Sequence, residues 1–190
     1  VTEEITGLDL VKEQIKIASG KKLDLTQEDI KINGHSMEIR VYAEDPKENF
    51  APSIGQLVQY KRPLGPGVRV DDGYEEGMDI PIFYDSMIAK LITHGSNRDE
   101  AIQRMKRAID EYKIQGIETT LKFCRWVMDH DEFRNGEFTT KFIEEYYDPK
   151  VLNEKTVAAL VADLILDRQE KAQKPKFADG FSKWRNRLSQ

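Results

Sequence analysis

The clearest pattern of hydrophobic and polar positions lies in residues 36–44. Every second position there is apolar: Met37, Ile39, Val41 and Ala43. Such alternation predicts a β-strand with one buried face and one polar face. The polar face carries Glu38, Arg40 and Tyr42, each two residues from the next.

Short apolar runs interrupted by proline and glycine follow this strand. Strands are expected at residues 57–60, 68–70, 80–84 and 87–93. Because the connections between them are short, they favour an antiparallel sheet over β-α-β units. Gly65, Pro66 and Gly67 predict a turn, and this stretch is too short to bind a phosphate.

Helical spacing of apolar residues occurs on both sides of these strands. The first helix follows a Thr6–Asp9 pattern that resembles a capping box, and it ends at Gly20. The strongest helix has Ser96 as its cap and ends at Gly116. Further helices are expected at residues 120–129, 140–147 and 157–164, and a polar tail at 168–190. The fold class is therefore α+β, an antiparallel sheet of short strands with flanking helices and a trailing C-terminal helix.

Composition narrows the possible function classes. The chain has 190 residues and a net charge of −5, which argues against a general nucleic-acid or membrane-surface binder. No apolar stretch reaches the ~18 residues of a membrane span. The single cysteine, Cys124, fits a reducing, cytoplasmic compartment and is expected to be a buried structural thiol. Three scattered histidines give no metal-ligand spacing.

Arg40 is the residue whose position suggests chemistry. A strand holds its guanidinium rigidly beside Glu38 and Tyr42, and a fixed guanidinium can stabilise an oxygen that becomes negatively charged. The pattern alone more often indicates a surface or cross-strand ion pair. The acidic pairs Asp71–Asp72 and Glu75–Glu76 are expected to be solvated turns.

Residues 34–46 resemble the pattern G-H-A-x-E-x-R-x-x-A-E-D-P of biotin carboxylases. In the same order, residues 52–55 resemble P-S-x-G, residues 84–91 resemble Y-D-S/P-M-I-x-K-L, and residues 116–120 resemble G-x-x-T-N, with Thr120 in place of Asn. Residues 1–11 resemble the segment after the last ATP-grasp strand of that family. The resemblance implies a biotin carboxylase C-terminal domain over residues 1–147, with a helix and linker toward a biotin-transfer or biotinyl region over residues 148–190.

The resemblance also implies an activity and roles for four residues. Biotin carboxylases are ligases that use ATP, Mg and bicarbonate to carboxylate N1′ of biotin. Arg40 falls on the family's catalytic, biotin-contacting position, where it stabilises the ureido oxygen as N1′ loses its proton. Arg69 and Asp85 fall on positions at or near a subunit interface. Thr140 corresponds to a position near the adenine pocket, and the alternative for Thr140 is a helix N-cap.

The implied partners are the ATP-grasp half of the same chain, a biotinyl carrier domain, a carboxyltransferase subunit and a second copy in a homodimer. The ATP-grasp half is expected upstream of Val1, so the chain alone is expected to be inactive and to bind neither ATP nor biotin tightly. Residues 41–46 and 66–71 resemble the α subunits of propionyl-CoA carboxylases most, with acetyl-CoA and pyruvate carboxylases as open alternatives. A non-catalytic dimerisation or docking module is the rival function.

Overall fold

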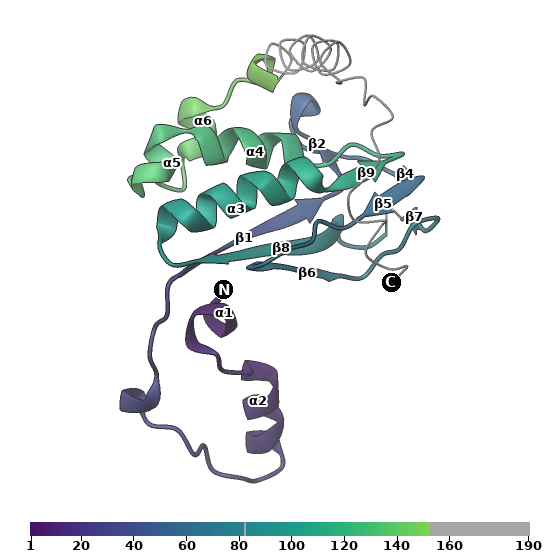
Figure 1. Cartoon of the computed structure of the whole chain (residues 1–190). Coiled ribbons are helices and arrows are strands. Elements are labelled where there is room, and N and C mark those ends of the chain that lie inside the picture. The colour runs from purple at the N-terminus through teal and green to yellow at the C-terminus, as the bar shows by residue number, and fades with distance from the viewer. Residues whose placement is uncertain (82, 153–190) are drawn as a thin grey trace, which may run out of the picture. The chain divides into compact units, whose positions relative to one another are not determined.

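The structure is a computed structural model that describes residues 1–81 and 83–152 (Figure 1). Its central sheet is antiparallel and has the strand order β1–β8–β6, formed by His35–Tyr42, Met87–Gly95 and Val68–Asp72. The expected α+β class with a sheet of short antiparallel strands is therefore confirmed. Strand β1 pairs only with β8 in this sheet, so it is an edge strand and its second edge is not paired within the sheet.

The remaining elements are short. The helices are α1 (Thr2–Thr6), α2 (Leu10–Ala18), α3 (Arg98–Glu111), α4 (Leu121–Asp129), α5 (Asp131–Asn135) and α6 (Phe142–Tyr146), with 3-10 turns at Gln27–Asp29 and Pro46–Glu48. Three two-stranded ladders pair β2 (Glu44–Asp45) with β3 (Ala51–Pro52), β4 (Gly55–Gln56) with β7 (Asp79–Ile80), and β5 (Gln59–Lys61) with β9 (Lys113–Gln115).

Strand β1 has the two faces that its alternation predicts. Met37, Ile39 and Val41 are buried, while Arg40 is exposed. The strand is shorter than expected, because its register with β8 shifts between Val41 and Tyr42, and the chain continues after this irregularity as β2. A register shift of this kind bends a strand and re-aims its side chains.

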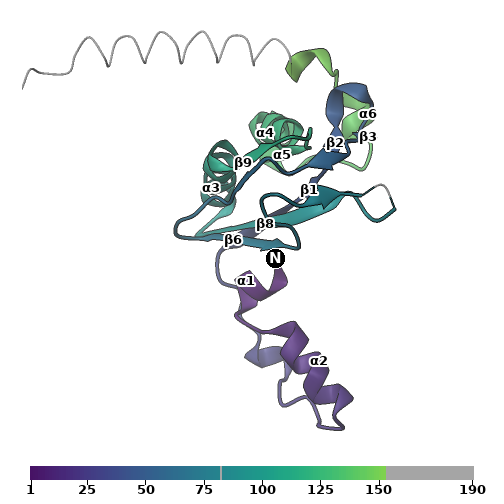
Figure 2. The ribbon, with the colours of Figure 1, turned by 90° about the vertical axis from the view of Figure 1, so that its right-hand side faces the viewer.

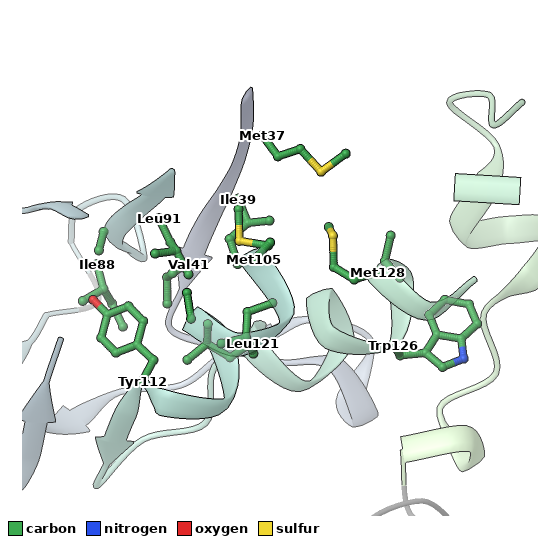
Figure 3. Close-up of a cluster of buried hydrophobic side chains, with 14 of the residues drawn as sticks. Met37, Ile39, Val41, Ile88, Leu91, Met105, Tyr112, Leu121, Trp126 and Met128 are labelled. Atoms are coloured by element: carbon green, nitrogen blue, oxygen red, sulfur yellow. The ribbon is translucent and has the colours of Figure 1, made fainter. Parts of the chain in front are cut away.

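Helices α3 and α4 cover the apolar face of the sheet (Figures 1 and 2). The core lies between the sheet and these helices (Figure 3). It contains side chains from β1, β8, α3 and α4, among them Ile39, Val41, Leu91, Met105, Leu121 and Met128. Removing each large apolar side chain of this kind from water contributes about 1.5–3 kcal/mol. This burial holds β1 against the helical layer.

Two helices begin, and one ends, at residues other than those expected, because of side-chain caps and strand pairing. Asn97, not Ser96, caps α3, because its side chain accepts a hydrogen bond from the Glu100 amide at 2.9 Å. Helix α3 ends at Glu111 instead of Gly116, because Lys113–Gln115 pairs with β5 as β9. Likewise Asp9, not Thr6, is the N-cap of α2.

Among the described residues of the expected strand at 80–84, only Ile80 lies in a strand, so the prediction is wrong at residues 81, 83 and 84. Asp79–Ile80 pairs with β4, and Pro81 has no N–H with which to continue the ladder. Phe83, which is 85% exposed, and Tyr84 lie instead in a turn before β8. Helix α5 was not expected, and the helix and tail expected at residues 157–164 and 168–190 lie outside the described residues.

Cys124 lies on α4 and packs against the core as a structural thiol, but it is half-buried instead of fully buried as expected. Burial raises the pKa of this thiol to about 12. Among the residues that the structure describes, no helix is both long and apolar enough to cross a membrane.

Gly116 offers a test of how tightly β9 packs. Its φ is +102°, and a Cβ at this position would lie 2.0 Å from the Gln56 carbonyl oxygen. We expect Gly116→Ala to lower the free energy of unfolding by about 3 kcal/mol, through backbone strain and overpacking together. Gly136→Ala is the matched control, because Gly136 also has positive φ but no atom near the added Cβ, and it should cost only about 1 kcal/mol. Equal losses in urea unfolding would contradict the close approach.

The raised pKa of Cys124 predicts low reactivity. At pH 8 a thiol with a pKa near 12 is ionised to only about 10⁻⁴, roughly a thousandfold less than an ordinary cysteine. We expect iodoacetamide to modify native Cys124 at least about a hundredfold more slowly than the urea-unfolded chain. Comparable rates for the native and unfolded chains, followed by mass spectrometry, would show an accessible thiolate instead.

Candidate functional site

Helices α3 and α4 cover one face of the β1–β8–β6 sheet. The other face is polar, and we call it the outer face. Residues directly opposite each other in antiparallel strands share a face. Arg40 of β1 lies opposite Lys90 of β8, and Lys90 lies opposite Asp71 of β6. One row further along, Glu38 and Arg69 flank Ile92. The register therefore brings residues from three separate strands into one charged surface.

Arg40 is held on this face with its guanidinium accessible. Its side chain is 59% exposed, Nη1 donates to the Tyr42 hydroxyl at 3.4 Å, and Nε lies 4.0 Å from Oε1 of Glu38. The hydrogen bond with Tyr42, followed by the charges of Glu38 and Asp85, raises the pKa of Arg40 further above its ordinary value. Its cross-strand neighbour is Lys90, so the cross-strand ion pair that the pattern allowed is not formed with β8, whereas the surface ion pair that it also allowed is present as the 4.0 Å pair with Glu38. A charged, oriented guanidinium is available to a ligand.

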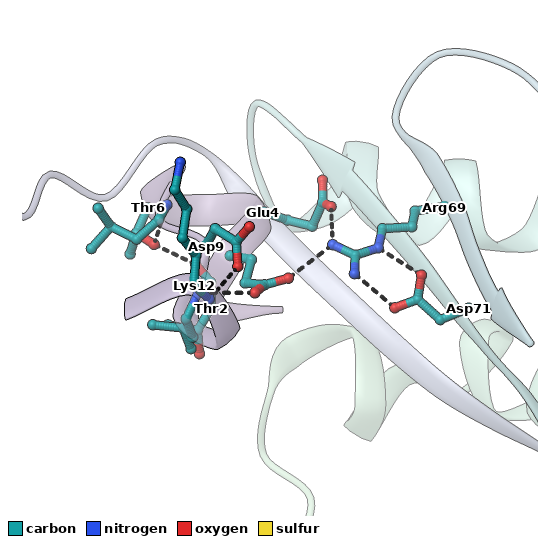
Figure 4. A network of polar contacts seen from close by, with 10 residues as sticks. Thr2, Glu4, Thr6, Asp9, Lys12, Arg69 and Asp71 are labelled. Atoms are coloured by element: carbon teal, nitrogen blue, oxygen red, sulfur yellow. Dashed lines mark hydrogen bonds and ion pairs between the residues drawn. The ribbon is translucent and has the colours of Figure 1, made fainter. Parts of the chain in front are cut away.

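Arg69 is the centre of an ionic cluster (Figure 4). Its Nε and Nη2 atoms donate to both carboxylate oxygens of Asp71 at 2.8 Å, and Nη1 donates to Glu3 at 3.0 Å and Glu4 at 3.2 Å. The hydrogen bonds from Arg69 to these three carboxylates raise its pKa. Because Glu3 and Glu4 belong to α1, the cluster ties α1 to the outer face.

The structure places Asp85 near Arg40 and leaves Thr140 among the helices. Asp85 lies in the turn before β8, where its carboxylate accepts from the Met87 amide at 2.9 Å, and its charge contributes to the raised pKa of Arg40. Thr140 is exposed before α6, and α6 packs its Phe142 ring on Trp126 of α4. Helix α4 covers the apolar face of the sheet, so Thr140 and Arg40 belong to opposite sides.

The alternative of Thr140 as a helix N-cap is wrong. Helix α6 begins after Lys141, and no side chain caps it. The neighbouring hydroxyl of Thr139 accepts from the Lys141 amide at 3.2 Å instead. The structure therefore assigns Thr140 no capping role.

A partly buried polar cluster that the sequence did not predict joins β5, β6 and the residue that follows α3. The Tyr60 hydroxyl lies 2.6 Å from that of Tyr112 and donates to Asp72 at 2.8 Å, and Arg62 pairs with Asp72 at 2.6 Å. Asp72 is thus not the solvated turn residue that was expected. Burial raises the pKa of Tyr112 to about 12 and raises that of Tyr60 as well, so both phenols stay protonated and serve structure.

Two further residues, both within the motifs that resemble biotin carboxylases, were not expected to lie near Arg40. Lys90 reaches the outer face only through the pairing of β1 with β8, and Thr120 bonds to the backbone around Arg40. Alternation in β8 was the available signal for Lys90, and the Thr-Thr pair before a helix was the signal for Thr120. Within the two described ranges, no group of three or more His, Cys, Asp or Glu side chains could hold a metal ion.

Comparison with known proteins agrees with this geometry. Residues 38–145 match the family described as "Biotin carboxylase C-terminal domain", and residues 1–26 match "Carbamoyl-phosphate synthase L chain, ATP binding domain". The chain is 55% identical to "Biotin carboxylase 1" of Bacillus subtilis, covering 77% of this chain and 32% of that protein. It is 52% identical to the mitochondrial "Propionyl-CoA carboxylase alpha chain" of Homo sapiens, covering 77% and 20%. The chain thus spans about a third or less of the length of these relatives.

Solved structures show the same fold. The biotin carboxylase domain dimer of 2-oxoglutarate carboxylase from Hydrogenobacter thermophilus, in complex with MgADP, ADP and bicarbonate, superimposes with a TM-score of 0.76 at 47% identity. The match covers 80% of this chain and 33% of that one. The family match covers more than half of the chain and includes β1 from Glu38 onward, together with β8, α3 and α4. The chain belongs to the biotin carboxylase C-terminal domain family.

Proposed function

We propose that this chain is the C-terminal part of the biotin carboxylase component of a biotin-dependent acyl-CoA carboxylase, and that Arg40 is its catalytic residue. The observation that carries the proposal is the guanidinium of Arg40, which is exposed on a rigid strand and oriented by Tyr42 and Glu38. Its position in a motif that resembles the biotin carboxylase pattern supports the same role.

The chemistry of this role follows from charge. Bound biotin supplies a ureido nitrogen that accepts the carboxyl group and a ureido oxygen that becomes more negative as that nitrogen loses its proton. Arg40 offers several N–H donors in a fixed plane, and the strand sets their direction before the ligand arrives. Donors that are already oriented cost no rearrangement when charge develops, so they stabilise the transition state more than the ground state.

ATP and Mg are proposed to bind mainly outside the described residues. The H. thermophilus relative was solved with MgADP, and residues 1–26 of this chain match an ATP-binding domain family. Helix α2, within that range, exposes Val11 and Ile15, which fits a segment that packs against further parts of an ATP-binding half. We assign no step through the metal to the described residues, since they contain no cluster of ligands for it. Thr140 remains a proposed contact to the nucleotide.

The acyl-CoA substrate and the partners are also proposals. We favour an acyl-CoA acceptor because residues 41–46 and 66–71 resemble the propionyl-CoA carboxylase type. A pyruvate acceptor is the alternative, since the human propionyl-CoA carboxylase alpha chain and a pyruvate carboxylase subunit from Methanothermobacter thermautotrophicus are about equally similar to this chain, at 52% and 53% identity. A biotinyl carrier domain would bring biotin to Arg40, and a carboxyltransferase subunit would consume the product. The single, half-buried cysteine supports a reducing, cytoplasmic location.

A second candidate function is dimerisation or docking without catalysis. The observation that favours it is the ordered charged cluster of Arg69, Asp71, Glu3 and Glu4 beside Arg40. The H. thermophilus domain was solved as a dimer, and we propose that Arg69 and Asp85 lie at a homodimer interface of this protein. Both functions are compatible in one chain, so Arg40 decides between a catalytic site and an assembly surface.

Replacement of Arg40 tests the proposed function directly. In the complete carboxylase that contains this domain, Arg40→Ala should lower kcat for biotin carboxylation by about 10²–10³-fold, because one donor to the developing charge is lost. The melting temperature and the oligomeric state should change little, since the side chain is largely exposed. ATP-dependent carboxylation of free biotin is the activity to follow, with calorimetry and size-exclusion chromatography beside it.

Arg107→Ala is the matched control. Arg107 lies on α3, away from the outer face, and pairs with Glu111 at 3.5 Å. This variant should keep its activity. If Arg40→Ala loses activity only in proportion to its loss of folded or dimeric protein, the assembly function is the correct one.

The requirement for an ATP-binding half makes a separate prediction. With ATP, Mg and bicarbonate, the isolated chain should not carboxylate free biotin, and turnover should appear when an ATP-binding half from a relative is added. An Arg40→Ala chain in the same mixture should remain inactive. Micromolar binding of ATP to the isolated chain, measured by titration calorimetry, would refute the proposed division of the site.

A further inference from the structure

At the edge of β1 that does not pair with β8, Thr120 forms hydrogen bonds with the backbone at Arg40 and Tyr42. The Thr120 hydroxyl donates to the Arg40 carbonyl oxygen at 3.3 Å and accepts from the Tyr42 amide at 3.1 Å. The Thr120 amide donates to the Tyr42 carbonyl oxygen at 3.1 Å. One residue thus satisfies three backbone groups of an edge strand, which would otherwise need other partners.

These bonds fall where β1 is least constrained by its neighbour. The register between β1 and β8 shifts between Val41 and Tyr42, one residue beyond Arg40. At such a shift the ladder is locally irregular, and a small rotation of the backbone moves a long side chain by a large distance. Thr120 binds the backbone on both sides of this point and is itself only 5% exposed.

The Thr120 hydroxyl is not used to begin its own helix. Thr120 is the N-cap residue of α4, yet its side chain makes no capping hydrogen bond there. The hydroxyl is directed to β1 instead, where it has one donor and one acceptor partner, and it also contacts the Cys124 side chain one turn further along α4. The helix therefore serves as a rigid support that carries this hydroxyl to the strand.

We propose that Thr120 is a positioning residue for catalysis, which sets the direction of the Arg40 guanidinium by fixing the β1 backbone at the register shift. This inference rests on the proposed function of Arg40 and adds a second residue to it. Thr120 touches neither biotin nor bicarbonate in this role. It acts through the Arg40 carbonyl and the Tyr42 backbone, and Tyr42 in turn contacts Nη1 of Arg40 at 3.4 Å.

The test is Thr120→Val in the complete carboxylase. Valine keeps the branched shape in a buried place but removes both side-chain hydrogen bonds to β1. Since misplacement of a catalytic group by about 1 Å can cost about 10²-fold, kcat should fall by about tenfold to a hundredfold while KM for ATP stays unchanged. The rate is calculated per folded molecule, with the folded fraction taken from circular dichroism.

Thr93→Val is the matched control. Thr93 is also fully buried, and its hydroxyl donates to the Ala101 carbonyl oxygen at 3.0 Å on the core face of β8. This variant should lose stability to a similar degree while its kcat stays within about twofold of the parent, because separate sites act independently. An equal fall of kcat in both variants would show a general effect of core damage and overturn the proposal.

Two conservative variants should restore the rate. Thr120→Ser keeps a hydroxyl, and Thr120→Asn supplies an amide that can also donate and accept, so both should turn over within a fewfold of the parent. If Thr120→Val does not fold, Thr120→Ala replaces it, because alanine is smaller and also removes both side-chain hydrogen bonds to β1. A folded Thr120→Val or Thr120→Ala enzyme with parental kcat would overturn the proposal.

The double variant with Arg40→Ala separates this inference from the proposed function. If Thr120 acts through Arg40, then Thr120→Val should change the residual rate of Arg40→Ala by less than about twofold. If Thr120→Val lowers kcat as much in the Arg40→Ala enzyme as in the parent, Thr120 acts independently of Arg40, and the inference alone is overturned. Parental activity in the Arg40→Ala single variant would instead overturn the proposed function, and the inference with it.

Discussion

Strand β1 connects the two sides of this domain, because it is bonded to β8 along one edge and to Thr120 along the other. Its buried face holds the sheet against α3 and α4, and its polar face carries Arg40. The burial of the core and the position of the Arg40 guanidinium therefore both depend on the register of β1. A shift of β1 by one residue would expose Ile39 and bury Arg40, at the cost of both the core and the charge.

Charge is arranged around Arg40 without neutralising it. Glu38 lies 4.0 Å away and the nearest side-chain hydrogen bond goes to a phenol, so neither forms a close ion pair with the guanidinium. Arg69 differs, because two of its nitrogens bind Asp71 bidentately and a third binds α1. Two arginines on one face thus have separate roles: one remains open to a ligand, and the other is used to hold structure.

The match to a biotin carboxylase C-terminal domain gives this arrangement a context. The relatives are three or more times longer than the matched segment, and residues 1–26 match a different family, an ATP-binding domain. The domain described here would then contribute a positioned guanidinium to a reaction whose nucleotide is held elsewhere. A site divided in this way explains why a single strand and its support, Thr120, carry the chemistry that we propose for this chain.

Sequence alone determined the two-faced strand β1, apart from its end at Tyr42, and the exposure of Arg40, because side-chain alternation is a local property of extended backbone. Helix α4 and the packing of Cys124 against the core followed from local patterns as well. Tertiary structure decided the rest. The end of α3 at Glu111 depends on the pairing of β9 with β5, and the place of Lys90 beside Arg40 depends on strand register. The bonds of Thr120 to Arg40 join residues 80 positions apart, and only the folded chain brings such partners within hydrogen-bonding distance.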